Sequence, residues 1–289
     1  MIPTWIQLTA GQPWPGVLSL TRVCTVLMWT VWRWGKFGGR VQAVLGLIFC
    51  IFALGGWIRQ ASYIWPGGNQ YPAVPLVIMA LAGWSAAKGP KASAAVGCVI
   101  FWVVLLVYLV TISTGVLAVE GQWLYWEGFK WDTSSFALSL LPCAAAMWKG
   151  RGGVPKRLLV IPALTICAGV VTVGVLSPTL ADVQVNSFLE LSKCLTIFGR
   201  VRRFEAVVSA GMTLGWFCLA TMLLNMCGEL SVKLKFGIEK PFVFGSVLLS
   251  SVVMLWNLHI SWVILGILGA VCWVLIPLLP QGIESEKKS

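Results

Sequence analysis

The sequence predicts an all-α, polytopic membrane protein of about nine transmembrane helices, and three observations support this class. Hydrophobic residues make up 58% of the 289 residues and charged residues only 11%, whereas soluble domains carry about 25% charged residues. Apolar runs near the length of a helical span, about 20 residues, follow one another almost from end to end. Lysine and arginine collect in the short segments between these runs. A single transmembrane domain over 1–289 is therefore expected.

Charged residues and turn-forming residues divide this domain into candidate spans, because a charge near the bilayer centre is costly. The nine expected spans are about 17–34, 42–59, 73–88, 95–118, 134–148, 158–177, 205–228, 241–257 and 260–279. The run at 185–198 is shorter, and it mixes Phe188 and Leu189 with Glu190 and Lys193. This pattern predicts an amphipathic helix that lies at the membrane interface and does not cross it.

The distribution of lysine and arginine predicts the orientation, because cytoplasmic loops carry an excess of these residues. If the N-terminus is outside, most of the 21 Lys and Arg residues fall on the inner side, in loops such as 35–40, 149–157 and 231–240 and in a cytoplasmic tail at 280–289. The net charge of +11 is then mainly a topology signal. A nucleic-acid partner is not expected, because such proteins gather their cations on one surface of a soluble domain.

The residue types that carry catalysis or bind metals are sparse. The chain contains none of the sequence motifs of serine hydrolases, zinc peptidases or phosphate-binding loops. Its nine cysteines form no C-x-x-C pair, and the single histidine, His259, has no partner at helical spacing. We therefore expect no enzyme activity, no metal and no cofactor, and we interpret buried cysteines as small apolar packing residues.

The expected span 205–228 carries the candidate ligand-binding face. Ser209, Thr213 and Trp216 are spaced i, i+4 and i+7, which places them on one side of a helix. Small hydroxyl residues either mediate contacts between membrane helices or line a path for a ligand or ion, and both interpretations stay open at this point. At the outer end of the helix, Arg203 and Glu205 are expected to form an ion pair, with Glu205 near the positive end of the helix dipole.

The order of residues in this region resembles one family. The stretch "FLEL" at 188–191, followed by "LTIFGRVRRFEAVVSAGMTLGWF" at 195–217, resembles the segment before and through the eighth helix of the endospore germination permeases. These are the B subunits of bacterial spore germinant receptors, in the amino acid–polyamine–organocation superfamily. The residues that carry the resemblance are Phe188, Leu189, Glu190, Arg203, Glu205, Ala206 and Trp216. The stretches at 58–94 and 136–150 resemble the third-to-fifth and sixth helix regions of the family.

The resemblance implies a ten-helix fold whose helices two to ten correspond to the nine expected spans, so we expect the first helix of the family to be absent from this chain. In this superfamily the first and sixth helices are broken near the middle of the membrane, and their unwound backbone binds the substrate. The segment that matches the sixth helix, "WDTSSFALSLL", has no glycine. Ser134 and Ser135 in this segment are candidate ligand contacts.

The function implied by the resemblance is that of a germinant receptor membrane subunit. Such a subunit lies in the inner membrane of the spore, senses a small nutrient such as an amino acid, and assembles with other receptor subunits to trigger germination. An amino-acid or ion permease of the same superfamily is an alternative, because a shared fold does not fix function. A structural subunit of a membrane complex that binds no ligand is another.

Overall fold

The computed structural model describes residues 26–27, 30–31, 39–62, 73–124, 155–177, 180, 187–195, 204–235, 239–255 and 262–278. All regular secondary structure in these residues is helical, which confirms the all-α class for this part of the chain. Most of the expected span 17–34 and all of 134–148 lie outside the described residues. Ser134 and Ser135 therefore lie outside them as well.

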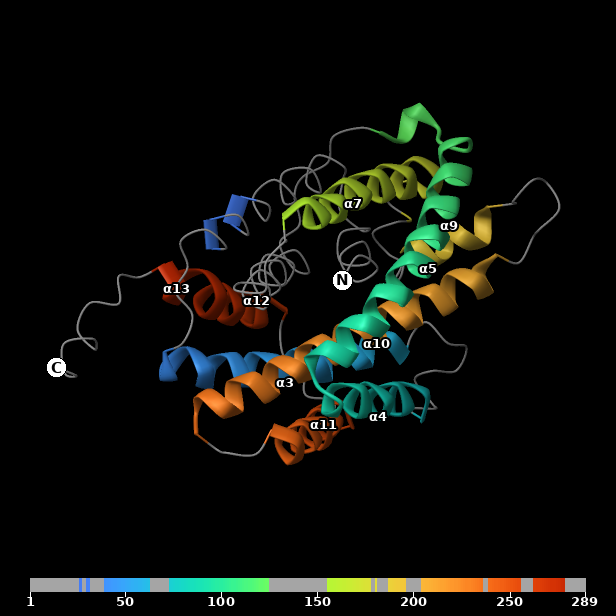
Figure 1. Ribbon diagram of the computed structural model, residues 1–289. Coiled ribbons are helices and arrows are strands. Elements are labelled where there is room, and N and C mark those ends of the chain that lie inside the picture. The colour runs from blue at the N-terminus through green and yellow to red at the C-terminus, as the bar shows by residue number, and fades with distance from the viewer. Residues whose placement is uncertain are drawn as a thin grey trace.

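The described helices follow the apolar runs of the sequence (Figure 1). They are α3 (Arg40–Ser62), α4 (Ala73–Ala87), α5 (Pro90–Val116), the short 3-10 helix η1 (Gly121–Trp123), α7 (Pro155–Leu176), α9 (Ser187–Cys194), α10 (Glu205–Lys233), α11 (Glu239–Leu255), α12 (Trp262–Ala270), the π-helical turn η2 (Val271–Leu275) and α13 (Ile276–Leu278). Within the described residues, three segments are long and apolar enough to cross a membrane: Arg40–Trp57 of α3, all of α5 and all of α10.

Helices α3, α7 and α11 begin or end two or three residues beyond the ranges that hydropathy predicted, and α5 and α10 each extend five residues beyond theirs at one end. Helix α5 begins at Pro90 and not near residue 95, because Pro90 is suited to the first helical position and Gly89 before it takes a φ of 98°. Helix α10 continues past residue 228 to Lys233, whose positive charge lies at the negative end of the helix dipole. Hydropathy marks the apolar part of a helix and not its polar ends.

Helix α10 is the centre of the described structure. It packs against α3, α4, α5, α9 and α11, and Figure 1 shows it running alongside α3 with α4 and α11 next to them. Helix α11 also packs against α3 and α4, while α7 contacts α5 and α9. Residues buried along most of α10 form the largest continuous part of the core. Any side chain near the middle of α10 is therefore positioned by several neighbouring helices.

Glycines let neighbouring helices approach closely. A Cβ atom added at Gly55 of α3 would lie 2.6 Å from Val253 Cγ1 of α11, and one added at Gly83 of α4 would lie 2.7 Å from Val247 Cγ2 of α11. Close backbone approach of this kind strengthens the van der Waals contacts that hold helices together in lipid. At the same crossing of α3 and α11, the Ser250 hydroxyl donates a 3.2 Å hydrogen bond to the Ile51 carbonyl.

We expect Ser250→Ala to lower the free energy of unfolding by about 0.6 kcal/mol, the average for hydrogen bonds between membrane helices. The neighbouring Ser251 is the matched control, because its hydroxyl donates to the Val247 carbonyl of its own helix. Ser251→Ala should leave the stability unchanged. Unfolding of the purified protein in mixed detergent micelles measures both variants. Equal losses in the two variants would contradict an interhelical role for Ser250.

The last helix is interrupted by the π-helical turn η2. The Ile276 N–H donates to the Val271 carbonyl, and Pro277 immediately afterwards has no N–H to continue the α-helical pattern. The side-chain amide of Gln42 in α3 donates a 3.2 Å hydrogen bond to the Cys272 carbonyl in this turn. The Cys272 thiol in turn lies 3.5 Å from the Gln42 carbonyl as a weak donor. The two hydrogen bonds join the beginning of α3 to the last helical segment that the structure describes.

Candidate functional site

The short helix α9 leads into the candidate region and is amphipathic in its packing. Phe188, Leu189 and Leu191 are buried, whereas Glu190 and Lys193 form a partly exposed ion pair of 2.6 Å. The Phe188 ring stacks on the ring of Tyr108 from α5, with centroids 4.6 Å apart and planes 7° from parallel. This stacking joins α9 to α5, and α9 also packs against α7 and α10. Its expected position at a membrane interface stays a prediction.

Helix α10 begins at Glu205, which lies in the first turn, where a carboxylate interacts favourably with the helix dipole. Phe204 precedes it and is buried. Arg203 lies outside the described residues, so the expected ion pair between Arg203 and Glu205 stays a prediction.

The two hydroxyl residues of the candidate face are half-buried and donate to their own helix. The Ser209 hydroxyl donates to the Glu205 carbonyl at 2.7 Å, and the Thr213 hydroxyl donates to the Ser209 carbonyl at 2.8 Å. Hydrogen bonding of this kind, four residues back, is a common way for Ser and Thr to satisfy their donor in a helix. The hydroxyl protons are thus used within α10, while the oxygens keep acceptor capacity.

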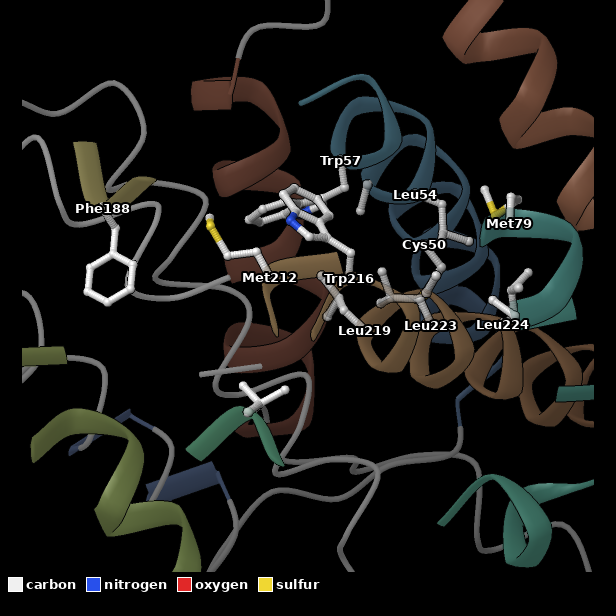
Figure 2. Close-up of a cluster of buried hydrophobic side chains, with 14 of the residues drawn as sticks. Cys50, Leu54, Trp57, Met79, Phe188, Met212, Trp216, Leu219, Leu223 and Leu224 are labelled. Carbon is white, nitrogen blue, oxygen red and sulfur yellow. The ribbon is translucent and has the colours of Figure 1, made fainter. Parts of the chain in front are cut away.

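Trp216 has different surroundings from these two residues, because it is almost fully buried, at 3% exposure. Its indole ring packs at an angle of 65° on the ring of Trp57 from α3, with centroids 4.5 Å apart. Figure 2 shows the two indoles lying against each other, with Met212 beside them. The indole Nε1 of Trp216 is buried and has no hydrogen-bond partner within the described residues.

A small void lies beside this indole pair, between α3, α4 and α10. Its volume is about 10 Å³, which is about the space that one water molecule needs. The residues that line it are Leu54, Trp57, Pro75, Ile78, Trp216, Leu219, Ala220 and Leu223. We call it the Trp216 void. The sequence-predicted face contributes only Trp216 to it; Ser209 and Thr213 do not line it.

The contribution of α3 and α4 to this site was not predicted from the sequence. Trp57 is the clearest omission, since it lies next to Gly55 and Gly56 on an apolar helix and is only 1% exposed. A tryptophan beside small residues is a signal of close helix packing that could have identified it. Pro75 and Ile78 carry no comparable signal, because apolar residues face lipid and protein alike in such helices.

The chain was also compared with known proteins. No model of a known protein family matches it, and no curated protein matches its sequence.

Proposed function

We propose that the chain is a multi-span membrane subunit of a spore germinant receptor, which senses a small nutrient together with other receptor subunits and triggers germination. The observation that carries this proposal is the sequence resemblance at 188–217, together with the helices formed by its described residues 188–195 and 204–217. The resemblance rests on Phe188, Leu189 and Glu190, followed by Glu205 and then Trp216. Phe188, Leu189 and Glu190 lie on the short helix α9. Glu205 is the first residue of α10, and Trp216 lies near its middle.

The proposed topology follows the distribution of cations. Nine spans, with the N-terminal side outside, place the loops at 35–40, 149–157 and 231–240 and the tail at 280–289 in the cytoplasm. In this arrangement α9 and the beginning of α10 lie on the outer side. A nutrient arriving from outside the spore's inner membrane would then meet this end of α10 first.

One observation favours a second role, that of a structural subunit that binds no ligand. Ser209 and Thr213 donate to their own helix, and Trp216 packs on Trp57 beside a void that has room for about one water molecule. A face of this kind can serve helix packing alone. The two roles predict different outcomes for a small change at Trp216.

Deletion of the gene tests the receptor role. We expect spores without this protein to lose germination in response to at least one nutrient, while a trigger that does not act through nutrient receptors still germinates them. The measurement is a dose–response across a panel of nutrients. Deletion spores whose curves match those of the parent for every nutrient would contradict the receptor role.

The Trp216→Phe variant, expressed in the deletion spores, separates sensing from assembly. If the indole N–H contacts the nutrient, its loss removes one neutral hydrogen bond and raises the half-maximal nutrient concentration about 2- to 13-fold. The protein level, measured by immunoblot, should match that of the wild type. A curve that overlays the wild type at equal protein level supports the structural role.

A further inference from the structure

The turn between α4 and α5 carries two lysines and no acidic residue. Lys88 directly follows α4, Lys91 is the second residue of α5, and both side chains are exposed. The segment 73–119 contains no aspartate or glutamate, and neither lysine forms an ion pair with any described residue. On the surface of a soluble protein two hydrated lysines would need no partner. The surfaces of the two adjoining helices make this pair different.

An exposed apolar row on α4 ends at Lys88. Val77, Leu81 and Trp84 are each more than half exposed, and with Lys88 they are spaced i, i+4, i+7 and i+11, which places all four on one face. The Lys88 ammonium group lies 5.2 Å from the centre of the Trp84 ring. The row therefore runs from apolar side chains through an amphipathic indole to a cation, which is the order from acyl chain to headgroup in a membrane.

A second exposed row on α5 begins at Lys91. Val99, Trp102 and Leu106 follow Lys91 on the same side of the helix, and each is more than half exposed. No residue of α5 before Val104 is buried, and α5 diverges from α4 after the turn (Figure 1). The two rows are apolar surfaces of the kind that lipid or another protein covers, and their cationic ends meet at one turn.

Hydrogen bonds hold this turn in place. The Gly89 N–H donates to the Ala86 carbonyl at 2.9 Å, and Gly89 reverses the chain with a φ of 98°. The Ser93 hydroxyl of α5 donates a shared hydrogen bond to the Ser85 carbonyl of α4 at 3.0 Å and to the Gly89 carbonyl at 3.1 Å. The backbone between the two lysines is thus fixed before a partner arrives, which lowers the entropy lost on binding.

The combination of charge and apolar surface selects the partner. A molecule that complements it has an anionic head, which meets the two ammonium groups, and apolar chains, which cover the two rows. A second copy of this chain is a poor partner, because two copies that meet at this turn would bring four ammonium groups together. A zwitterionic phospholipid covers the apolar rows equally well, but the cation in its headgroup offsets its phosphate.

We infer that Trp84, Lys88 and Lys91, which we call the Lys88 corner, bind the headgroup of an anionic phospholipid whose acyl chains lie along the exposed rows of α4 and α5. This rests on the membrane position that the proposed function gives to these two helices, and the proposed topology places the corner on the cytoplasmic side. The headgroup phosphate accepts from the two ammonium groups. The Trp84 indole lies at the level where headgroup and acyl chains meet.

Quenching of Trp84 fluorescence by brominated lipid tests this site. The full chain is reconstituted in phosphatidylcholine nanodiscs, and part of the lipid is replaced by phosphatidylglycerol or phosphatidylcholine with acyl chains brominated close to the headgroup. The difference in emission between the wild type and Trp84→Phe reports Trp84. We expect brominated phosphatidylglycerol to associate on the order of 30-fold more tightly than brominated phosphatidylcholine, from about fivefold for each lysine.

Three double variants show whether the two lysines cause this preference. Lys88→Gln with Lys91→Gln should make the two lipids equal, whereas Lys88→Arg with Lys91→Arg should keep the preference because the charges remain. The matched control is Lys233→Gln with Lys235→Gln, which removes the same charge from two exposed lysines at the end of α10. This control should leave the preference unchanged, because it leaves the Lys88 corner intact.

Four outcomes would overturn the inference. They are equal quenching of wild-type Trp84 by the two lipids, an equal loss of preference in the control pair, displacement of brominated phosphatidylglycerol by soluble glycerol phosphate, and no quenching by either lipid. The third would show a phosphate site that does not need acyl chains. The fourth would mean that lipid does not cover Trp84, and it would also reject the membrane position of α4.

The germination assay separates this site from the receptor role. A preference for phosphatidylglycerol in a protein whose deletion leaves germination unchanged keeps the lipid site and rejects the receptor role. Loss of germination on deletion, with equal quenching by the two lipids, keeps the receptor role and rejects the lipid site.

Discussion

Replacing Gly55 by alanine will lower the stability of the protein by about 1–3 kcal/mol or more, the range for overpacked cores. The new Cβ would lie 2.6 Å from Val253 Cγ1, 2.9 Å from Val253 Cβ and 3.1 Å from the Ser250 carbonyl oxygen. The last of these atoms belongs to the backbone, so a change of rotamer at Val253 cannot relieve the whole overlap. Helices α3 and α11 must then separate, which also weakens the hydrogen bond between Ser250 and Ile51.

Thermal unfolding in detergent and the amount of protein in the membrane measure this effect. Gly97 of α5 is the matched control, because a Cβ added there meets no atom within 4 Å. Gly97→Ala should be neutral or slightly stabilising, since alanine is favoured over glycine within a helix. Adding Val253→Ala to the Gly55 variant should restore only part of the loss. Equal stability of the Gly55 and Gly97 variants would show that α3 and α11 do not pack as closely as described.

The Trp216→Ala variant is expected to lose about 3–5 kcal/mol of stability, because it removes a buried aromatic side chain and leaves a cavity. The indole lies between α10 and α3, where it contacts Trp57, and no exposed surface compensates for its removal. This loss is large enough to reduce the amount of folded protein. Alanine at this position therefore cannot separate a sensing role from a structural one, whereas phenylalanine keeps an aromatic ring in place.

Trp84 provides the comparison for this variant. Its ring is exposed, and its described contact is with the Lys88 ammonium group, 5.2 Å from the ring centre. A cation–π contact at an exposed site contributes about 0.5–1 kcal/mol, so Trp84→Ala should cost no more than that. The measurement is the unfolding free energy of both variants in the same detergent. Equal losses of unfolding free energy in Trp216→Ala and Trp84→Ala would mean that Trp216 is not part of the core.

The positions of the helices could be predicted from the sequence because apolar runs and their charged boundaries are local features. Helix α10 begins at Glu205, as the charge pattern indicated, and α4 occupies almost the expected range. The predicted start of α5 and the predicted end of α10 were wrong, because each helix continues there through polar or small residues. The π-helical turn at Val271–Leu275 was not predicted, although Pro277 is a signal that the hydrogen bonding changes nearby.

The partners of each helix could not be predicted, because large apolar residues lie on the exposed faces of the described helices as well as on the buried faces. Residues that face lipid and residues that face other helices are both apolar, so hydrophobic periodicity does not distinguish them. Trp57 is buried and Trp84 is exposed, yet both lie in apolar helices. Gln42 contacts Cys272, and Trp57 contacts Trp216. The residues of each pair are far apart in the chain, so no local sequence pattern predicts these contacts. The helical spacing of Ser209 and Thr213 could be recognised in the sequence. The hydrogen bonds that their hydroxyls donate to carbonyls of α10 could not be predicted from it.

The central place of α10 has a consequence for how the protein is made. Helices α3, α4 and α5 leave the ribosome first, but the helix that fills the space between them is completed only at Lys233. At translation rates of about 5–20 residues per second, several seconds or more pass between the synthesis of α5 and that of α10. During this interval the faces of the early helices that later pack on α10, with Trp57 among them, lack this partner. If the chain spans a membrane, as proposed, its early helices must then stay able to pack until α10 has been synthesised.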